Sequence, residues 1–144
     1  MKTIGIAADH AGFIYKEEIC KNLVCQGYTV ADFGTFSQKS IDYPDVAHPL
    51  ASAVEQGDVA CGIALCGSGN GINMTLNKYR GVRSALCWTP EIAKMARLHN
   101  DANVCALPAR FIDLESALLI VNTFLDTAFE AGGRHQRRVV KIPC

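Results

Sequence analysis

The chain lacks several features that would assign it to a common class of protein. Lys plus Arg and Asp plus Glu number 14 each among 144 residues, so no net charge favours nucleic acid or an anionic membrane. No apolar run approaches the roughly 18–20 residues of a membrane span. The opening MKTIGIAADH lacks the order of a signal peptide, because its apolar run ends at an acid and a histidine. We therefore expect neither nucleic acid nor a membrane as partner.

The cysteines also lack any tight pairing. They number seven, an odd count, and form no C-x-x-C, which removes the signatures of zinc ribbons and thioredoxin-like redox sites. Most lie in apolar runs, where a reduced thiol packs as a small hydrophobic group, and we expect this of Cys61, Cys87 and Cys105. The cysteine usage predicts a reducing, cytoplasmic setting.

Short β-rich runs alternate with helical segments along the chain. Strands are expected at 3–9, 28–34, 60–66, 83–87 and 103–108. Helices are expected over 13–26, 44–57, 71–78 and 90–100, and after Asp113. Thr89 and Asp113 are the expected N-caps, and Pro49 is a potential kink in the second helix. The basic C-terminal segment 131–144 is expected to end in a short edge strand.

This alternation predicts the fold class. Near-continuous apolar strands separated by helices favour an α/β fold with a mostly parallel sheet covered on both faces. Five strands in one chain without repeats or linkers suit a single domain over 1–144, a doubly wound three-layer sandwich. Ligands of such sheets bind beyond the carboxyl ends of the strands, where the strand order reverses. With the order 2-1-3-4-5, that place receives Asp9, His10 and Cys66.

Three alternating glycines follow Cys66 in the segment IALCGSGNGI. Gly67, Gly69 and Gly71 let successive backbone N–H groups face one concavity before a short helix, which suits an anion or a developing oxyanion. The same field favours a thiolate, so we expect a lowered pKa for Cys66 and a role as base or nucleophile. No G-K-[ST] follows, which excludes a P-loop. A cysteine-dependent phosphatase would need C-x5-R, but the sixth residue after Cys66 is Ile72.

The histidines and the C-terminal arginines can be interpreted either as structural or surface residues or as part of a binding site. His10 could cap the first helix, and His48 fits a helix surface. His99 closes a helix, where a histidine complements the dipole. The segment GGRHQRR at 132–138 gathers three guanidiniums and an imidazole after two glycines, which suits a phosphate clamp.

Six segments occur together and in order: GIAADHAGF near the start, DYPD at 42–45, CGSGNGI at 66–72, NKYRGVRSALC at 77–87, HNDANV at 99–104 and GGRHQRR at 132–138. Together they resemble the sugar-phosphate isomerase family that contains type B ribose-5-phosphate isomerases and galactose-6-phosphate isomerase subunits. The resemblance covers nearly the whole chain. It implies a Rossmann-like fold, no metal and no nucleotide cofactor. It also implies a homodimer, or a tetramer built as a dimer of dimers, with the site shared between subunits.

The resemblance also implies roles for single residues. Cys66 would be the base that moves a proton between carbons 1 and 2, and His99 the acid that opens the furanose ring. The enediolate oxygen would be held by the loop residues Gly67, Ser68, Gly69, Asn70 and Gly71, with the Ser68 hydroxyl taking part. Sugar hydroxyls would be bound by Asp9, His10, Tyr43 and Asn100, and the phosphate by Arg110, Arg134, His135 and Arg138, with His10 also near it.

The expected reaction is the interconversion of ribose 5-phosphate and ribulose 5-phosphate through an enediolate. Such chemistry needs a base near neutrality, preorganised donors for the developing charge and a remote anchor, and the chain offers residues for all three. A six-carbon substrate (allose 6-phosphate or galactose 6-phosphate) and a non-catalytic sugar-phosphate-binding module are the alternatives. Pro108 and Ala109 stand where glycine-containing turns are usual in the family, which leaves the reach of Arg110 open.

Overall fold

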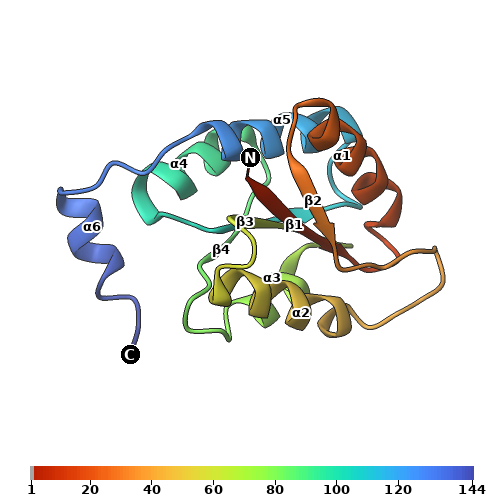
Figure 1. Cartoon of the computed structure of the whole chain (residues 1–144), viewed down its shortest axis with the longest axis horizontal. Helices are drawn as coiled ribbons and strands as arrows, with labels where there is room; N and C mark the ends of the chain where they lie inside the picture. The colour runs from red at the N-terminus through yellow and green to blue at the C-terminus, as the bar shows by residue number, and fades with distance from the viewer. Residues whose placement is uncertain (1) are drawn as a thin grey trace.

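The alternating pattern folds into three layers in the computed structural model, which describes residues 2–144 (Figure 1). The strands are β1 (Thr3–Ala8), β2 (Thr29–Asp32), β3 (Cys61–Cys66), β4 (Ser84–Leu86) and β5 (Val104–Pro108). The helices are α1 (Phe13–Cys25), α2 (Tyr43–Gln56), α3 (Asn70–Leu76), α4 (Pro90–Asn100), α5 (Leu114–Asp126) and α6 (Arg134–Val139). The expected strands and the first four expected helices differ from these bounds by no more than two residues.

All four strand pairings of the sheet are parallel, which confirms the predicted α/β class. The order, however, is β2-β1-β3-β5-β4, so the expected 2-1-3-4-5 is wrong at one edge. All residues of β5 are buried, whereas the three residues of β4 are half-buried. The fully apolar strand therefore takes the interior position and the short strand takes the edge. The switch point between β1 and β3 is unaffected.

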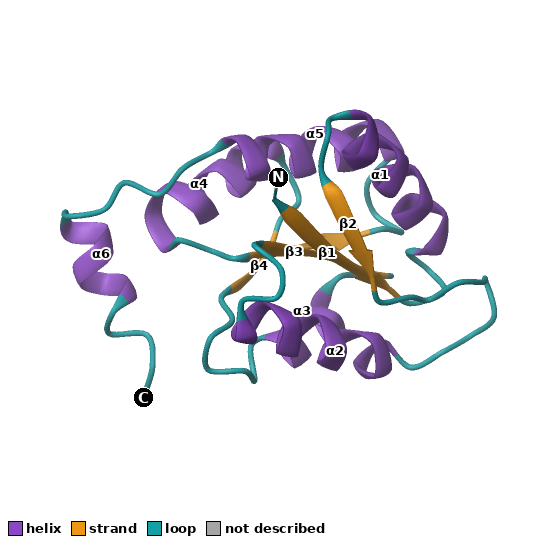
Figure 2. Ribbon diagram, viewed as in Figure 1, coloured by secondary structure: helices purple, strands orange, loops and turns teal. Residues whose placement is uncertain are grey.

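The two faces of the sheet carry side chains of different size. Ile63 and Leu65 of β3 point into the core under α1, α4 and α5, where Phe124 is also buried. Ala64 and Cys66 point to the other face, under α2 and α3. Figure 2 shows these two helical layers on opposite sides of the strands. The period-two alternation of a strand thus places the side chain of Cys66 in the layer formed by α2 and α3.

The helix ends follow the expected capping chemistry. Thr89 Oγ1 accepts a hydrogen bond from the Ile92 amide at 3.2 Å, and Asp113 Oδ1 accepts one from the Ser116 amide at 2.7 Å. A hydrogen bond with the Ser116 side chain, together with this bond from the Ser116 amide, lowers the pKa of Asp113. Helix α2 continues across Pro49.

The C-terminal segment departs from expectation. Residues 134–139 form α6 rather than leading to an edge strand, and α6 packs against α4 (Figure 1). Gly133 accepts from the amide of Arg137, which closes the first turn, and the long side chains that follow are good helix formers. Within residues 2–144, no helix combines the length and apolar character needed to cross a bilayer.

Candidate active site

The carboxyl ends of β1 and β3 bring an acid, an imidazole and a thiol to one edge of the sheet. The Asp9 amide donates to the Leu65 carbonyl at 3.1 Å, which ties the end of β1 to the end of β3. Asp9 is buried, and its Oδ1 accepts from the amides of Ala11 at 2.9 Å and Gly12 at 3.3 Å. Asp9, rather than His10, therefore satisfies the turn that leads into α1, and Gly12 is the N-cap there.

The thiol of Cys66 lies at the bottom of the glycine loop. Cys66 is 4% exposed, and the backbone amides of Ile72, Gly69 and Gly71 lie close enough to its sulfur to favour the thiolate. Burial raises the pKa of the Cys66 thiol by more than these amides lower it, and the charge of Asp9 adds to the increase. The expected lowering of the pKa is therefore wrong for the chain by itself, because desolvation outweighs the amides.

Two of the glycines are required by close approach. A side chain at Gly69, whose φ is +77°, would place its Cβ 2.4 Å from Leu86 Cδ1 and 3.1 Å from the Leu107 backbone. A Cβ at Gly71 would lie 2.4 Å from Cζ of Tyr43, the first residue of α2. The Tyr43 ring therefore covers the loop, and the glycines allow the backbone to reach both the sulfur and the ring.

The remaining loop residues and Arg110 complete this group. Ser68 Oγ accepts from the Asn70 amide at 3.3 Å and from Asn70 Nδ2 at 3.2 Å. The Arg110 amide donates to the Gly67 carbonyl at 3.0 Å, and its guanidinium lies beside Gly67, where a Cβ would be 3.3 Å from a terminal nitrogen. Arg110 thus reaches the loop although Pro108 and Ala109 precede it.

His10 has a partner that no sequence pattern signals. The Ile41 amide donates to His10 Nδ1 at 3.2 Å. An accepting Nδ1 places the proton of the neutral ring on Nε2, so the ring presents a donor on its other side. Because the partner is a backbone amide, the identity of residue 41 carries no information about this contact.

The other predicted residues gather around the end of α4. The rings of His99 and His135 stack with centroids 4.1 Å apart and planes 13° apart. Loss of hydration lowers the pKa of His135, and the nearby His99, Arg134 and Arg138 lower it further. Asn100 is exposed at the last position of α4, and Arg134 and Arg138 lie one turn apart on α6.

The residues around Cys66 and the residues around the end of α4 lie at opposite edges of the sheet. Helix α4 follows the carboxyl end of β4 and leads back to the amino end of β5, so its last residues lie at the amino edge. Its 11 residues span about 16 Å at 1.5 Å per residue. Cys66 ends β3 at the carboxyl edge. A single chain therefore does not bring His99 close to Cys66. The sequence could have indicated this separation, because a helix between two parallel strands runs from the carboxyl edge of the sheet to its amino edge and His99 lies at the end of α4.

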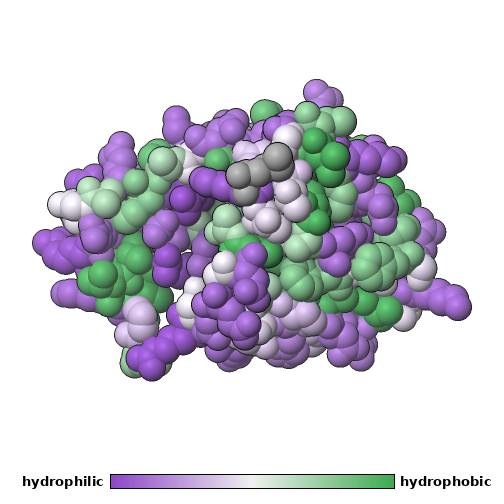
Figure 3. All heavy atoms as spheres, in the orientation of Figure 1, coloured by the Kyte–Doolittle hydropathy of each residue, from purple (hydrophilic) through white to green (hydrophobic). Residues whose placement is uncertain are grey.

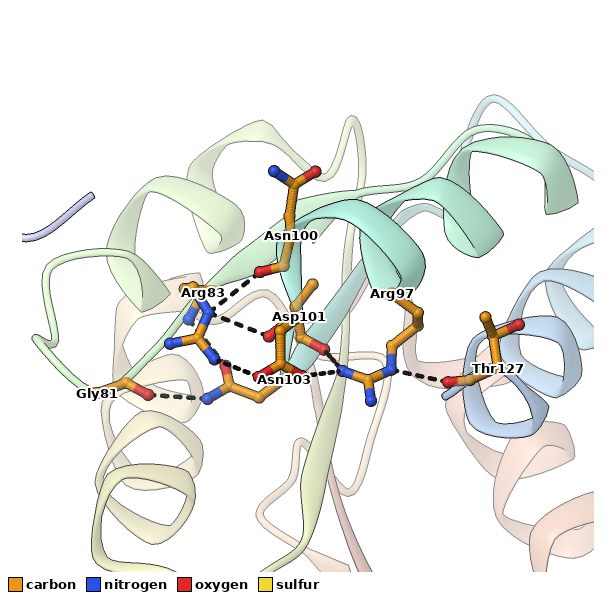
Figure 4. Close-up of polar contacts among 8 residues, drawn as sticks. Gly81, Arg83, Arg97, Asn100, Asp101, Asn103 and Thr127 are labelled. Carbon is orange, nitrogen blue, oxygen red and sulfur yellow. Dashed lines mark hydrogen bonds and ion pairs between the residues drawn. The ribbon is translucent and has the colours of Figure 1, made fainter. Parts of the chain in front are cut away.

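Three residues to which the sequence analysis assigned no role hold this end of α4, although Arg83 and Asp101 lie within two of the six segments. Arg83 and Arg97 both form ion pairs with Asp101, which follows the helix (Figure 4). No single segment predicts this contact, because Arg83 precedes β4 whereas Arg97 belongs to α4 and Asp101 is its C-cap.

Comparison with known proteins agrees with this architecture. The ribose/galactose isomerase family matches residues 4–142. Ribose-5-phosphate isomerase B of Escherichia coli is 46% identical over 99% of this chain and 95% of its own length. A probable ribose-5-phosphate isomerase B of Mycoplasma genitalium is 41% identical over 96% and 92%.

Solved structures are equally similar. Ribose-5-phosphate isomerase B of Clostridium thermocellum superposes with a TM-score of 0.95 at 47% identity, covering 97% of this chain and 94% of that one. The Mycoplasma genitalium enzyme with bound ribulose 5-phosphate superposes with a TM-score of 0.92 at 41% identity, covering 97% and 93%. These similarities confirm the resemblance drawn from the six segments. The chain belongs to the ribose/galactose isomerase family.

Proposed function

We propose that this protein is an aldose–ketose isomerase that interconverts ribose 5-phosphate and ribulose 5-phosphate. The observation that carries the proposal is the sulfur of Cys66, which lies at the carboxyl end of β3 beside the backbone amides of Gly69, Gly71 and Ile72. This arrangement places a proton acceptor next to preorganised N–H donors, the pair of groups that enediolate chemistry needs. The family to which the chain belongs and the similarity to ribose-5-phosphate isomerases B support the same reaction.

Proton transfer falls to Cys66. As a thiolate it takes the proton from carbon 2 of the open-chain aldose and, once protonated, returns it to carbon 1. Negative charge develops on the substrate oxygens in between. The amides of the Gly67–Gly71 loop stabilise it, and the loss of one such donor costs about 3–4 kcal/mol in other enzymes. Ser68 adds a hydroxyl at the mouth of this loop.

Binding groups surround the reacting carbons. Asp9, whose Oδ2 receives no bond from residues 2–144, and His10 accept and donate hydrogen bonds to the sugar hydroxyls. Arg110 contributes to binding of the phosphate from its place beside Gly67. A phosphate held away from the reacting carbons supplies binding energy that orients them.

The remaining groups reach the site from a second copy of the chain. His99, Asn100, Arg134, His135 and Arg138 cluster at the edge of the sheet opposite Cys66, so the complete site requires a homodimer, alone or within a tetramer. In it, His99 of one copy opens the furanose ring bound at Cys66 of the other, and the α6 arginines hold the phosphate. Exposed Val140 and Ile142 on the C-terminal segment, over which Figure 3 shows a hydrophobic patch, provide apolar surface for this contact.

Isomerisation in heavy water tests the reaction. The protein should convert ribose 5-phosphate to ribulose 5-phosphate and introduce deuterium at carbon 1. Cys66→Ala should abolish both, whereas Cys25→Ala, which removes an exposed thiol, should keep them. Preference for allose 6-phosphate or galactose 6-phosphate in the same assay would reassign the substrate, and binding without conversion would overturn the proposal.

Hybrid dimers test the shared site. Cys66→Ala and His99→Asn should each be inactive alone. Random mixing by co-refolding yields half heterodimers, each with one intact shared site of two, so about a quarter of the wild-type activity should return. No recovery would show that each site is built from one chain.

The seven cysteines are all free, which supports a reducing, cytoplasmic location for this function.

A further inference from the structure

A three-residue ionic contact encloses the end of α4. The Asp101 carboxylate accepts from Arg83 at 3.1 Å through Oδ2 and from Arg97 at 3.0 Å through Oδ1. Figure 4 shows the two guanidiniums on either side of this carboxylate. Each oxygen thus has its own cation, and the three side chains are only partly exposed, between 21% and 36%.

The same arginines also bind the backbone around the helix end. Arg83 Nε donates to the Asn100 carbonyl at 3.2 Å and to the Asp101 carbonyl at 3.0 Å. Arg97 donates to the carbonyls of Ala102 and Thr127, the latter at 3.1 Å. The last carbonyls of a helix have no partner within the helix, so these bonds prevent the end of α4 from fraying.

Asp101 has a backbone conformation that is uncommon for a residue other than glycine. Its φ is +45°, and it is the one non-glycine residue between 2 and 144 in the left-handed region. Glycine adopts that conformation freely, whereas Asp, although it is one of the few L-residues found there, adopts it at a cost. What Asp adds over glycine is the carboxylate, and the carboxylate holds the two arginines in place.

His99 and Asn100 are the last two residues of α4, directly before Asp101. We infer that Asp101, together with Arg83 and Arg97, is a positioning residue for ring opening: the ionic contact fixes the helix end that presents His99. This inference rests on the proposed function. None of the three needs to touch the substrate, because they act through the backbone of residues 99–100.

Proton exchange and ring opening can be measured separately. Ribulose 5-phosphate is acyclic, since its carbon 5 oxygen carries the phosphate, so exchange of its carbon 1 proton with solvent needs Cys66 but no ring opening. Conversion of ribose 5-phosphate needs both. A defect confined to His99 therefore lowers conversion and leaves exchange intact, which a general loss of structure would not do.

Asp101→Gly is the test, because it keeps the turn and removes the carboxylate. We expect a melting temperature near that of the wild type, ribose 5-phosphate turnover lowered about tenfold or more, and exchange at saturating ribulose 5-phosphate within about twofold of wild type. Asp101→Asn, which keeps size and one acceptor, should show a smaller defect. Glu91→Gln, which removes an exposed acid from the first turn of α4, is the matched control and should change neither rate.

The outcomes separate the two proposals. Equal loss of turnover and exchange, or no loss of either in both Asp101 variants, overturns the positioning role while the isomerase proposal stands. A wild-type protein without turnover and exchange overturns the isomerase proposal, and the positioning role with it.

Discussion

The contact between Gly71 and Tyr43 supports a prediction that separates stability from activity. In Gly71→Ala the new Cβ would lie 2.4, 2.6 and 2.8 Å from Cζ, Cε1 and Cε2 of the Tyr43 ring. Carbon atoms in contact prefer about 3.5–4.0 Å, so the ring has to move by about 1 Å. It can do so, because Tyr43 is 38% exposed and is therefore not held on all sides by the core.

The two effects on stability nearly cancel. Alanine is favoured over glycine inside a helix by up to about 1 kcal/mol, and displacement of a partly exposed ring loses a similar amount of packing. The free energy of unfolding, measured in urea, should therefore change by less than about 1 kcal/mol. Activity should fall, because the displaced tyrosine covers the loop that we propose binds the enediolate. A displacement of about 1 Å at such a site can lower kcat/KM up to about a hundredfold.

A double-mutant comparison identifies the cause. Tyr43→Ala removes the ring, so adding Gly71→Ala to it should raise stability and cause no further loss of kcat/KM. The reasoning is refuted if Gly71→Ala alone keeps wild-type kcat/KM, or if it lowers kcat/KM as much in the Tyr43→Ala background as in the wild type.

Three further predictions follow from charges and thiols. Lys16 is fully buried, and its Nζ lies 2.5 Å from Asp32 and 3.4 Å from the more exposed Glu17. Asp32→Ala leaves this buried cation with only the longer contact, so it should lower the free energy of unfolding by up to about 3–5 kcal/mol, more than Lys16→Met does; urea curves of equal midpoint for the two variants would contradict this. Because burial raises the pKa of Cys66 and the base must be a thiolate, kcat/KM should rise with pH above neutrality; a flat profile from pH 7 to 9 would argue against the thiolate. Burial raises the pKa of the Cys61 thiol from 9.0 to about 11, so this thiol ionises at lower pH in the unfolded state than in the folded state. The free energy of unfolding should therefore fall by up to about 3 kcal/mol between pH 9 and 11, and by less in Cys61→Ala. Thermal melts that show the same alkaline loss of stability in both proteins would disprove this.

Local patterns in the sequence were enough to place the elements and the loop. Apolar runs of strand length, helical spacing and capping residues such as Thr89 and Asp113 depend on neighbours within a few positions, so they can be recognised without the fold. The position of Cys66 at the end of β3 also follows from such a pattern, since the carboxyl ends of parallel strands share one edge.

Long-range competition decided the rest, and that is available only from the tertiary structure. The fully buried β5 displaced the half-buried β4 from the interior of the sheet, a choice between two strands 17 residues apart. The pKa of Cys66 is raised because the whole α2–α3 layer excludes water from its sulfur, which no loop motif reports. The pairing of Arg83 with Asp101, and the separation of His99 from Cys66, likewise arise where segments distant in sequence meet or fail to meet in space.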